Sequence, residues 1–188
     1  MRIIAGKLKG SSLFLPKNKN TRPLKDITRE SIFNLLNHSN KMFFQFEKSS
    51  ILDLYSGTGS FGLECLSRES KLVYFVEKEK EVIRILEKNI QKLKQKENTK
   101  VFISDSLNFI KKNTFDIKFD LIFCDPPFKN DNIDKLLELI LKNNLLKKDG
   151  LIILHRNKKI QEKLPNFLKI IDERIYGLSK IIFGKMLF

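Results

Sequence analysis

The chain has 188 residues, and its 36 lysines and arginines outnumber its 22 aspartates and glutamates, which gives a formal net charge of +14. This length predicts one compact domain with at most a small extension, and the positive charge favours a polyanionic partner such as a nucleic acid. Two distant cysteines argue against a disulfide framework or a metal site, and because no apolar run suggests a membrane span or a signal peptide we expect a cytoplasmic protein.

The first 40 residues are predicted to form a basic appendage. RIIAGKLKGSSLFLP, residues 2–16, has the pattern of a short hairpin that turns at its glycines. The first 30 residues hold eight basic and two acidic side chains. We therefore expect residues 1–40 to dock the polyanion and residues 41–188 to form the main domain. DITRESIFNLLNH, residues 26–38, predicts an amphipathic helix with its apolar residues on or near one face: Ile27, Ile32, Phe33, Leu35 and Leu36.

From residue 51 onward, strand-like and helix-like patterns alternate. Apolar runs without alternation, which are typical of parallel strands covered on both faces, occupy residues 51–55, 72–76, 100–103, 119–124 and 150–156. Helical patterns lie between them at residues 61–69, 78–95, 106–112 and 131–144. This alternation predicts an α/β fold with a doubly wound, Rossmann-like sheet.

The pattern changes after residue 164. Two β-rich runs, LKIIDERIYG and SKIIFGKMLF, follow each other with too few residues between them for a helical crossover. Because a tight turn joins only antiparallel strands, we predict a carboxyl-terminal hairpin. The complete sheet is then expected to have about seven strands, mostly parallel, with that antiparallel hairpin at its end.

A glycine-rich loop follows the first predicted strand. GTGSFG matches G-x-G-x-x-G with Gly57, Gly59 and Gly62, and Glu77 lies 20 residues beyond Gly57 at the end of the second strand. Glycines allow the backbone to turn tightly and approach a ligand, and a carboxylate at the next strand end can accept hydrogen bonds from ribose hydroxyls. The spacing predicts a site for a ribose-bearing cofactor, the alternative being a plain strand-to-helix turn.

Two further acids bear on the kind of cofactor. Asp53 lies in the first strand just before the loop, where it suits a ligand with a charged amino-acid end. Asp105, followed by Ser106, comes after the third strand and could accept a hydrogen bond from an adenine amine. A pyrophosphate would favour few carboxylates near the loop. The acids therefore favour S-adenosylmethionine over a dinucleotide, unless each merely caps a loop or a helix.

The stretch FDLIFCDPPFKN, residues 119–130, ends a buried strand abruptly. Pro126 and Pro127 have no N–H for a neighbouring strand, so the ladder stops and the chain turns. Asp125 and Phe128 are then expected at the carboxyl end of the strand, where open α/β sheets bind ligands. An acid, proline carbonyls and an aromatic ring in that place could hold a flat molecule that carries an amine. The alternative is a purely structural Asp-Pro turn.

GTGSFG, Glu77, Asp105 and DPPF, in this order, resemble the class I S-adenosylmethionine-dependent methyltransferases that modify exocyclic amines. With MRIIAGKLKG, RPLKDITRESIFNLL and ILDLYSGTGSFGLECLSR added, nearly the whole chain resembles the RsmD family of bacterial 16S ribosomal RNA guanine-N2 methyltransferases. DPPF alone is shared by amine methyltransferases of DNA, RNA and protein. The amino-terminal motifs therefore carry the RNA assignment.

The resemblance implies which residues hold the cofactor, and it implies no metal. The methionine end would lie against Asp53, Gly57, Thr58 and Gly59, the ribose against Glu77, and the adenine against Asp105 and Ser106.

The resemblance also implies that Asp125, Pro126, Pro127 and Phe128 hold the target base. Asp125 and the carbonyl of Pro126 would accept hydrogen bonds from the guanine N2 amine, and Phe128 would stack on a base taken out of its helix. The family commonly has tyrosine in the last place of the motif, so Phe128 keeps the stacking face and lacks the hydroxyl.

For the RNA, within an assembled or assembling small subunit, we expect Arg22, Arg29 and the lysines of residues 7–25, Lys7 and Lys9 among them, to bind phosphates. An alternative for Arg29 is an ion pair along its own helix. His38 and His155 are interpreted as helix-end and strand-end residues without a catalytic role.

Other functions compete with RNA methylation. One is methylation of adenine or cytosine amines in DNA. A nucleotide-binding oxidoreductase is disfavoured because DPPF has no place in hydride transfer and about 50 residues precede the glycine loop. A catalytically silent RNA-binding module is the third.

Overall fold

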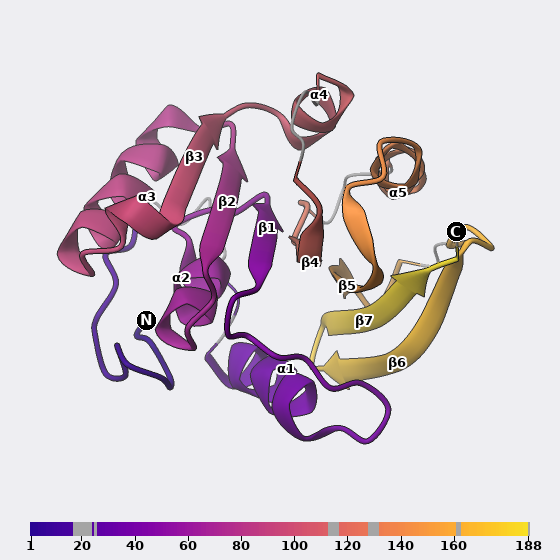
Figure 1. The fold of residues 1–188 in the computed structure, drawn as a ribbon, viewed down its shortest axis with the longest axis horizontal. Helices are drawn as coiled ribbons and strands as arrows, with labels where there is room; N and C mark the ends of the chain where they lie inside the picture. Colours follow the sequence, from indigo (N-terminus) through magenta and orange to yellow (C-terminus); the bar gives the residue numbers. More distant parts are fainter. Residues whose placement is uncertain (17–23, 25, 113–116, 128–131, 161–162, 188) are drawn as a thin grey trace.

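The computed structural model describes residues 1–16, 24, 26–112, 117–127, 132–160 and 163–187. Within them, one sheet of seven strands has the order β3-β2-β1-β4-β5-β7-β6 (Figure 1). The strands are β1 (Ser50–Leu54), β2 (Leu72–Glu77), β3 (Thr99–Ile103), β4 (Phe119–Cys124), β5 (Leu146–Asn157), β6 (Leu168–Tyr176) and β7 (Ser179–Met186). The helices are α1 (Asp26–His38), α2 (Ser60–Ser67), α3 (Lys80–Lys92), the short 3-10 helix η1 (Lys96–Asn98), α4 (Ser106–Lys111) and α5 (Ile133–Lys142).

The directions of the strands confirm the predicted fold class. β1 to β5 pair in parallel, and β7 runs antiparallel to both β5 and β6. The predicted carboxyl-terminal hairpin is therefore β6 and β7. β5 begins at Leu146, before the apolar run at 150–156, and the pairing of β4 with β5 shifts register between Phe119 and Leu121.

Helices cover both faces of the sheet, which explains why the central strands carry apolar residues at successive positions. One hydrophobic cluster joins α1, α2 and α3 to strand residues such as Ile51, Phe75 and Phe123. A second cluster, on the opposite face of the sheet, joins α4 and α5 to the strand residues that alternate with those of the first cluster, such as Leu52 and Ile122. Among the helices of the described segments, none is long and apolar enough to cross a membrane.

The amino-terminal segment is a turned hairpin that packs against α2. Arg2 and Ser12 form an isolated antiparallel bridge, and the buried side chain of Ile3 belongs to the same hydrophobic cluster as α1 and α2. The fully buried carboxylate of Glu64 accepts hydrogen bonds from the backbone N–H groups of Ile4 and Ala5, at 2.7 and 3.0 Å. Hydrogen bonds from the hairpin backbone to a side chain of α2 thus hold the hairpin against the rest of the protein.

Helix α1 has the predicted amphipathic character, but its buried face differs from the predicted one. Ile32, Phe33 and Leu36 are fully buried, as expected. Ile27 is 73% exposed, whereas Arg29 is completely buried. Arg29 lies three and four residues before Ile32 and Phe33, so the helical period places it on the same face as those core residues.

Candidate functional site

Three carboxylates meet where the central parallel strands end. The register of β1 places Leu54 beside Val76 of β2 and beside Cys124 of β4. Asp53 in β1, Glu77 at the end of β2 and Asp125 directly after β4 therefore lie at one edge of the sheet. This is the edge at which open α/β sheets bind ligands.

The glycine loop between β1 and α2 turns in the left-handed region. Gly57 has φ 54° and Gly59 has φ 83°, values that side chains rarely tolerate. At Gly59 a Cβ atom would also lie 2.3 Å from Leu86 Cδ1. These two positions consequently require glycine for the shape of the loop, as the sequence pattern predicted.

The acids bind the loop backbone. Gly62 N–H donates to Asp53 Oδ2 at 3.0 Å, and Gly57 N–H donates to Glu77 Oε2 at 3.0 Å. Glu77 Oε1 also accepts from the N–H groups of Lys78 and Glu79. Glu77 thus fixes the loop between β1 and α2, and Asp53 holds the first turn of α2, so the capping role considered for Asp53 is present.

Asp53 keeps an unused acceptor. Its side chain is 1% exposed, and its Oδ1 atom is buried without a hydrogen-bond partner among the described residues. Burial raises the pKa of the Asp53 carboxyl well above its ordinary value; the hydrogen bond from Gly62 opposes this shift, and the charges of Asp125 and Glu77 add to it. A buried carboxylate with an idle oxygen is suited to a ligand that brings a cationic donor.

The other residues expected around a cofactor are Asp105, Ser106 and Thr58, and they differ in their contacts and burial. Asp105 is the N-cap of α4, where its side chain accepts from the N–H of Asn108 at 3.1 Å. Ser106 is buried at the start of α4, and Thr58 is buried in the glycine loop. The structure thus places Asp105 and Ser106 after β3, next to the end of β2, where Ser104 N–H donates to the Glu77 carbonyl.

Asn89 of α3 is a contact that the sequence analysis did not identify. Its buried amide donates to the carbonyls of Thr58 and Phe14, and its oxygen accepts from the N–H of Phe14 at 2.7 Å. Asn89 therefore joins the glycine loop to the amino-terminal hairpin. Its polarity on the helix face that also carries Leu86 and Ile90 was the one available signal.

Asp125, the first residue of the DPPF motif, makes a second contact that the sequence analysis did not identify. Asp125 Oδ1 lies 2.7 Å from His155 Nδ1, so His155 is part of the site, although the sequence analysis gave it no role. Pro126 is buried and Pro127 is exposed. Phe128 lies outside the described residues, and its predicted stacking role stays a prediction.

The residues expected to bind phosphates do not behave alike. Lys9 is exposed, and Lys7 is exposed but forms an ion pair with Glu69 that raises its pKa. Arg22 lies outside the described residues. Arg29 donates to the Arg2 carbonyl at 2.5 Å and to Asp26 Oδ1 at 3.0 Å.

The prediction that Arg29 binds phosphate is not supported. The side chain is fully buried, and burial lowers its pKa although Asp26 acts in the opposite direction. A guanidinium in this place has no solvent-facing surface for a phosphate. The alternative considered for Arg29, an ion pair along its helix, is what the structure contains.

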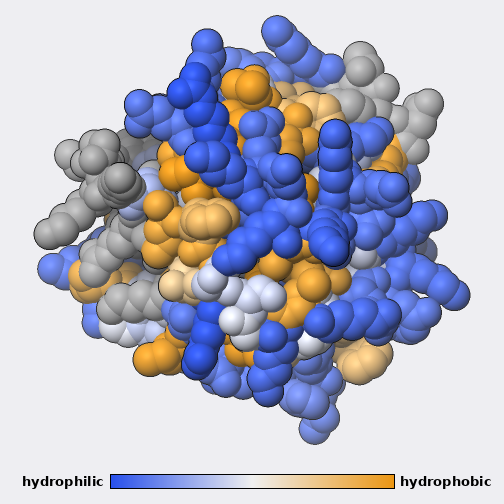
Figure 2. All heavy atoms as spheres, turned by 90° about the vertical axis from the view of Figure 1, so that its left-hand side faces the viewer, coloured by the Kyte–Doolittle hydropathy of each residue, from blue (hydrophilic) through white to orange (hydrophobic). Residues whose placement is uncertain are grey.

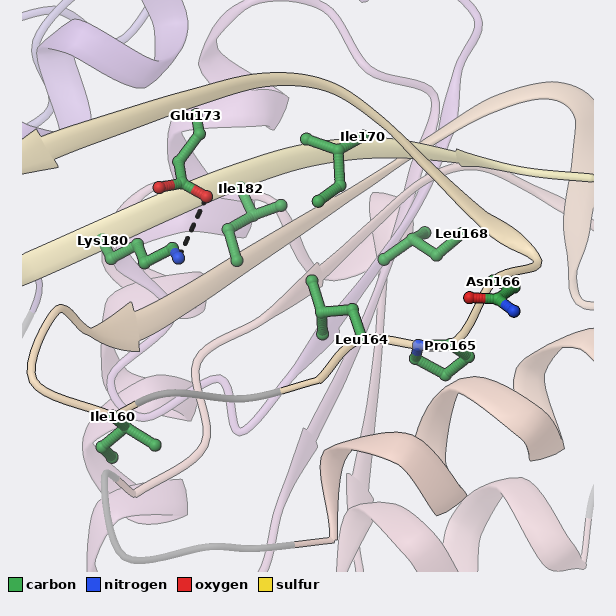
Figure 3. Close-up of a pocket in the computed structure, with 9 residues that line it drawn as sticks. All are labelled: Ile160, Leu164, Pro165, Asn166, Leu168, Ile170, Glu173, Lys180 and Ile182. Atoms are coloured by element: carbon green, nitrogen blue, oxygen red, sulfur yellow. Dashed lines mark ion pairs between the residues drawn. The ribbon is translucent and has the colours of Figure 1, made fainter.

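A separate pocket of about 560 Å³ lies beside β6 and β7, the last two strands in the order of the sheet. Its walls come from β6, β7 and the segment before β6, and the ion pair between Glu173 and Lys180 lies at one side of it (Figure 3). None of the predicted site residues lines this pocket. Within the described part of the chain, no group of three or more His, Cys, Asp or Glu side chains could hold a metal ion.

A family model described as conserved hypothetical protein 95 matches residues 1–185. The chain belongs to this family. Ribosomal RNA small subunit methyltransferase D of Haemophilus influenzae is 34% identical over 179 residues, which cover 95% of this chain and 90% of that protein. The protein of the same name from Escherichia coli K12 is 30% identical over 88% of this chain and 78% of its own length. The resemblance to the RsmD family that the motifs indicated is therefore confirmed.

Two solved structures share the whole fold of this chain. A putative methylase of Haemophilus influenzae superposes with a TM-score of 0.79 at 32% identity and covers 100% of this chain and 98% of its own. A putative methyltransferase of Escherichia coli gives a TM-score of 0.84 at 26% identity, with coverage of 99% and 97%. The fold is thus that of the Rossmann-like methyltransferases, including the antiparallel carboxyl-terminal strands.

Proposed function

We propose that this chain transfers a methyl group from S-adenosylmethionine to the exocyclic N2 amine of a guanine in 16S ribosomal RNA, as a step in maturation of the small ribosomal subunit. The names of its relatives support the small-subunit RNA as substrate. The observation that carries the proposal is the placement of Asp125 beside Asp53 and Glu77 at one sheet edge. That arrangement brings an acceptor for an amine next to a loop that suits a ribose-bearing, cationic cofactor.

The residues fit S-adenosylmethionine for a physical reason. The idle buried oxygen of Asp53 would accept from the ammonium of the methionine end, and Glu77 and Asp105 would accept from the ribose and from the adenine amine. Gly57 offers space, because nothing lies within 4 Å of the place a Cβ would occupy. When bound, the cofactor supplies an electrophilic methyl group on a sulfonium.

The acceptor side of the reaction is mainly a problem of alignment. The lone pair of the guanine N2 amine is delocalised into the ring, so the amine is a weak nucleophile. We propose that Asp125 and the Pro126 carbonyl accept hydrogen bonds from its two N–H groups and direct the nitrogen toward the methyl group. The methyl group supplied by the bound cofactor would pass from its sulfur to this nitrogen, and Asp125 would take up the proton that the nitrogen loses.

The target base has to leave its stack to reach this edge, at a cost of a few kcal/mol. Stacking on Phe128 would offset about 1–3 kcal/mol of that cost. A loop or bulge is the easier target because its bases are already partly unstacked. A target in the ribosomal subunit implies that the enzyme works in the cytoplasm.

The amino-terminal hairpin and α3 are the proposed RNA-docking face. Hydrophilic side chains cover most of the side of the molecule that carries α3 and the amino terminus, with apolar areas between them (Figure 2). Lys88 and Lys92 are exposed one turn apart on α3, and Lys92 donates to Ser12 of the hairpin. The two elements thus form one surface, to which Lys7 and Lys9 of the hairpin would add charge; the proposed role of Arg22 rests on the sequence alone.

Replacing Lys9 with alanine is expected to weaken the salt dependence of RNA binding. Each lost phosphate contact reduces the slope of log affinity against log salt by about 0.7 for single strands and 0.9 for duplexes. Binding is measured over a salt series with a fragment of small-subunit RNA. The matched control is Lys169→Ala, an exposed lysine on the far edge strand β6. Equal slopes for Lys9→Ala and the unsubstituted protein would remove Lys9 from the RNA-docking face.

The class of acceptor is tested by offering labelled S-adenosylmethionine with three polymers. Small subunits from a strain without this methyltransferase are expected to accept methyl groups, with naked small-subunit RNA equal or poorer and DNA inactive. The main alternative, methylation of adenine or cytosine amines in DNA, predicts the reverse order. Incorporation into DNA alone would overturn the proposed substrate while leaving the reaction type in place.

A further inference from the structure

His155 connects the proposed catalytic acid to the interior of the sheet. Its Nδ1 lies 2.7 Å from Asp125 Oδ1, and its Nε2 lies 2.8 Å from Ser179 Oγ. The imidazole is almost completely buried, with 6% of the residue exposed. Both ring nitrogens are therefore engaged by side chains from two other strands or strand ends.

The backbone fixes this arrangement. Parallel pairing of β4 with β5 places Cys124 beside Leu154, so the next residues, Asp125 and His155, are neighbours. Antiparallel pairing of β5 with β7 places Ser179, the first residue of β7, opposite Asn157. β5 lies between β4 and β7 inside the sheet, so the imidazole is held by elements that cannot shift independently.

The chemistry of the partners assigns the hydrogens. An ionised carboxylate only accepts hydrogen bonds, so the hydrogen between Asp125 and His155 belongs to Nδ1. In the neutral imidazole Nε2 is then an acceptor, and the Ser179 hydroxyl donates to it. The order of donation runs from Ser179 to His155 to Asp125.

We propose that His155 is a positioning residue for Asp125 in the methyl transfer. Its Nδ1–H holds Oδ1 of the carboxylate and leaves Oδ2 for the hydrogen of the substrate amine. Among the contacts of the described residues, no other side chain bonds the Asp125 carboxylate. This inference rests on the proposed function, because the hydrogen bond from His155 can affect methyl transfer only if Asp125 binds the substrate amine.

A held carboxylate matters because alignment supplies much of the rate. Without a donor at Oδ1, Asp125 can rotate about its Cβ–Cγ bond and present either oxygen at any angle. Misplacement of a reacting group by about 1 Å costs on the order of 100-fold in rate. His155 therefore acts on kcat, not on the affinity for RNA or for the cofactor.

Two variants of equal size separate the hydrogen bond from packing. In His155→Asn the amide nitrogen is as many bonds from Cα as Nδ1 and can donate to Asp125, whereas His155→Leu has the same shape without a donor. We expect His155→Leu to lower kcat by about 10- to 100-fold with both KM values within about twofold, and His155→Asn to stay within about threefold of the unsubstituted enzyme. Equal losses in both variants, or no loss in His155→Leu, would overturn the proposal.

A readout independent of activity comes from nitrogen-15 NMR of the intact protein with labelled histidine. The chain has two histidines, so a His38→Gln variant assigns the His155 signals. We expect a proton on Nδ1, and a changed Nε2 signal in Ser179→Ala. The opposite tautomer would overturn the inference even if methyl transfer occurs. The expected tautomer in a protein that methylates no RNA would instead count against the proposed function.

Discussion

Replacing Asp125 with asparagine is expected to lower kcat by about 10²–10⁴-fold, the range found when a positioned acid or base is lost. The amide keeps the shape of the carboxylate but loses its charge and its capacity to take the proton of the amine. Asp125 lies at the ligand edge of the sheet and is held by His155, so the loss is expected in the methyl-transfer step. The measurement is single-turnover transfer from labelled S-adenosylmethionine to small subunits.

A matched control lies at the other end of the same strand. Asp120 has a side chain 26% exposed, against 23% for Asp125, and pairs with Lys147 far from the ligand edge. Asp120→Asn is expected to leave single-turnover rates unchanged. If Asp125→Asn transfers methyl groups as fast as the control, the proton leaves by another route and Asp125 is only part of the turn.

Replacing Asp53 with asparagine is expected to separate cofactor binding from stability. The variant loses the charge that would pair with the ammonium of the methionine end, so the cofactor should bind about 10- to 100-fold more weakly, as for loss of a charge-assisted hydrogen bond of roughly 1.5–3 kcal/mol. The same variant should unfold at a higher temperature than the unsubstituted protein near neutral pH, because it removes a buried charge. Calorimetry measures both properties.

The pH dependence follows from the raised pKa of Asp53 in the folded state. Because the folded protein binds this proton more tightly than the unfolded chain does, stability is fully present below the ordinary carboxyl pKa and is lost as pH rises toward the folded-state pKa. The gain in melting temperature from Asp53→Asn should therefore grow with pH above about 4. A pH-independent difference would contradict this account of Asp53.

Asp53→Ala is the companion variant. It also removes the charge, but it leaves the Gly62 N–H without its acceptor, at a cost of about 1–3 kcal/mol. We expect this variant to be less stable than Asp53→Asn at every pH. Equal stability of the two would mean that the bond to the glycine loop contributes nothing to the fold.

The sheet was predictable because its strands are short apolar runs, and burial on both faces demands such runs. The glycine loop and the acids at the carboxyl ends of β1, β2 and β4 were predictable because the ends of parallel strands determine where side chains meet. The start of β5 was not, because LKKD at residues 146–149 has no strand-like pattern and pairs through a register shift.

The errors concern residues whose environment depends on packing. Arg29 was expected to bind RNA from its charge, yet its spacing to Ile32, Phe33 and Leu36 already placed it on the buried face of α1. His155 could not be matched with Asp125 from sequence, since that contact depends on the register of β4 with β5. Asn89 meets the glycine loop across 31 residues, so its polarity on an apolar helix face could indicate a buried role but could not identify its partners.

The most direct test of the central proposal is the identity of the methylated nucleoside. Small subunits that lack the modification are incubated with the purified protein and labelled S-adenosylmethionine, and their RNA is digested to nucleosides and separated by mass spectrometry. We expect the label to appear in N2-methylguanosine, and to appear at least about 100-fold more slowly when Asp125→Asn replaces the unsubstituted protein. Label in a methylated adenosine or cytidine, or label that appears as fast with Asp125→Asn as with the unsubstituted protein, would contradict the proposal.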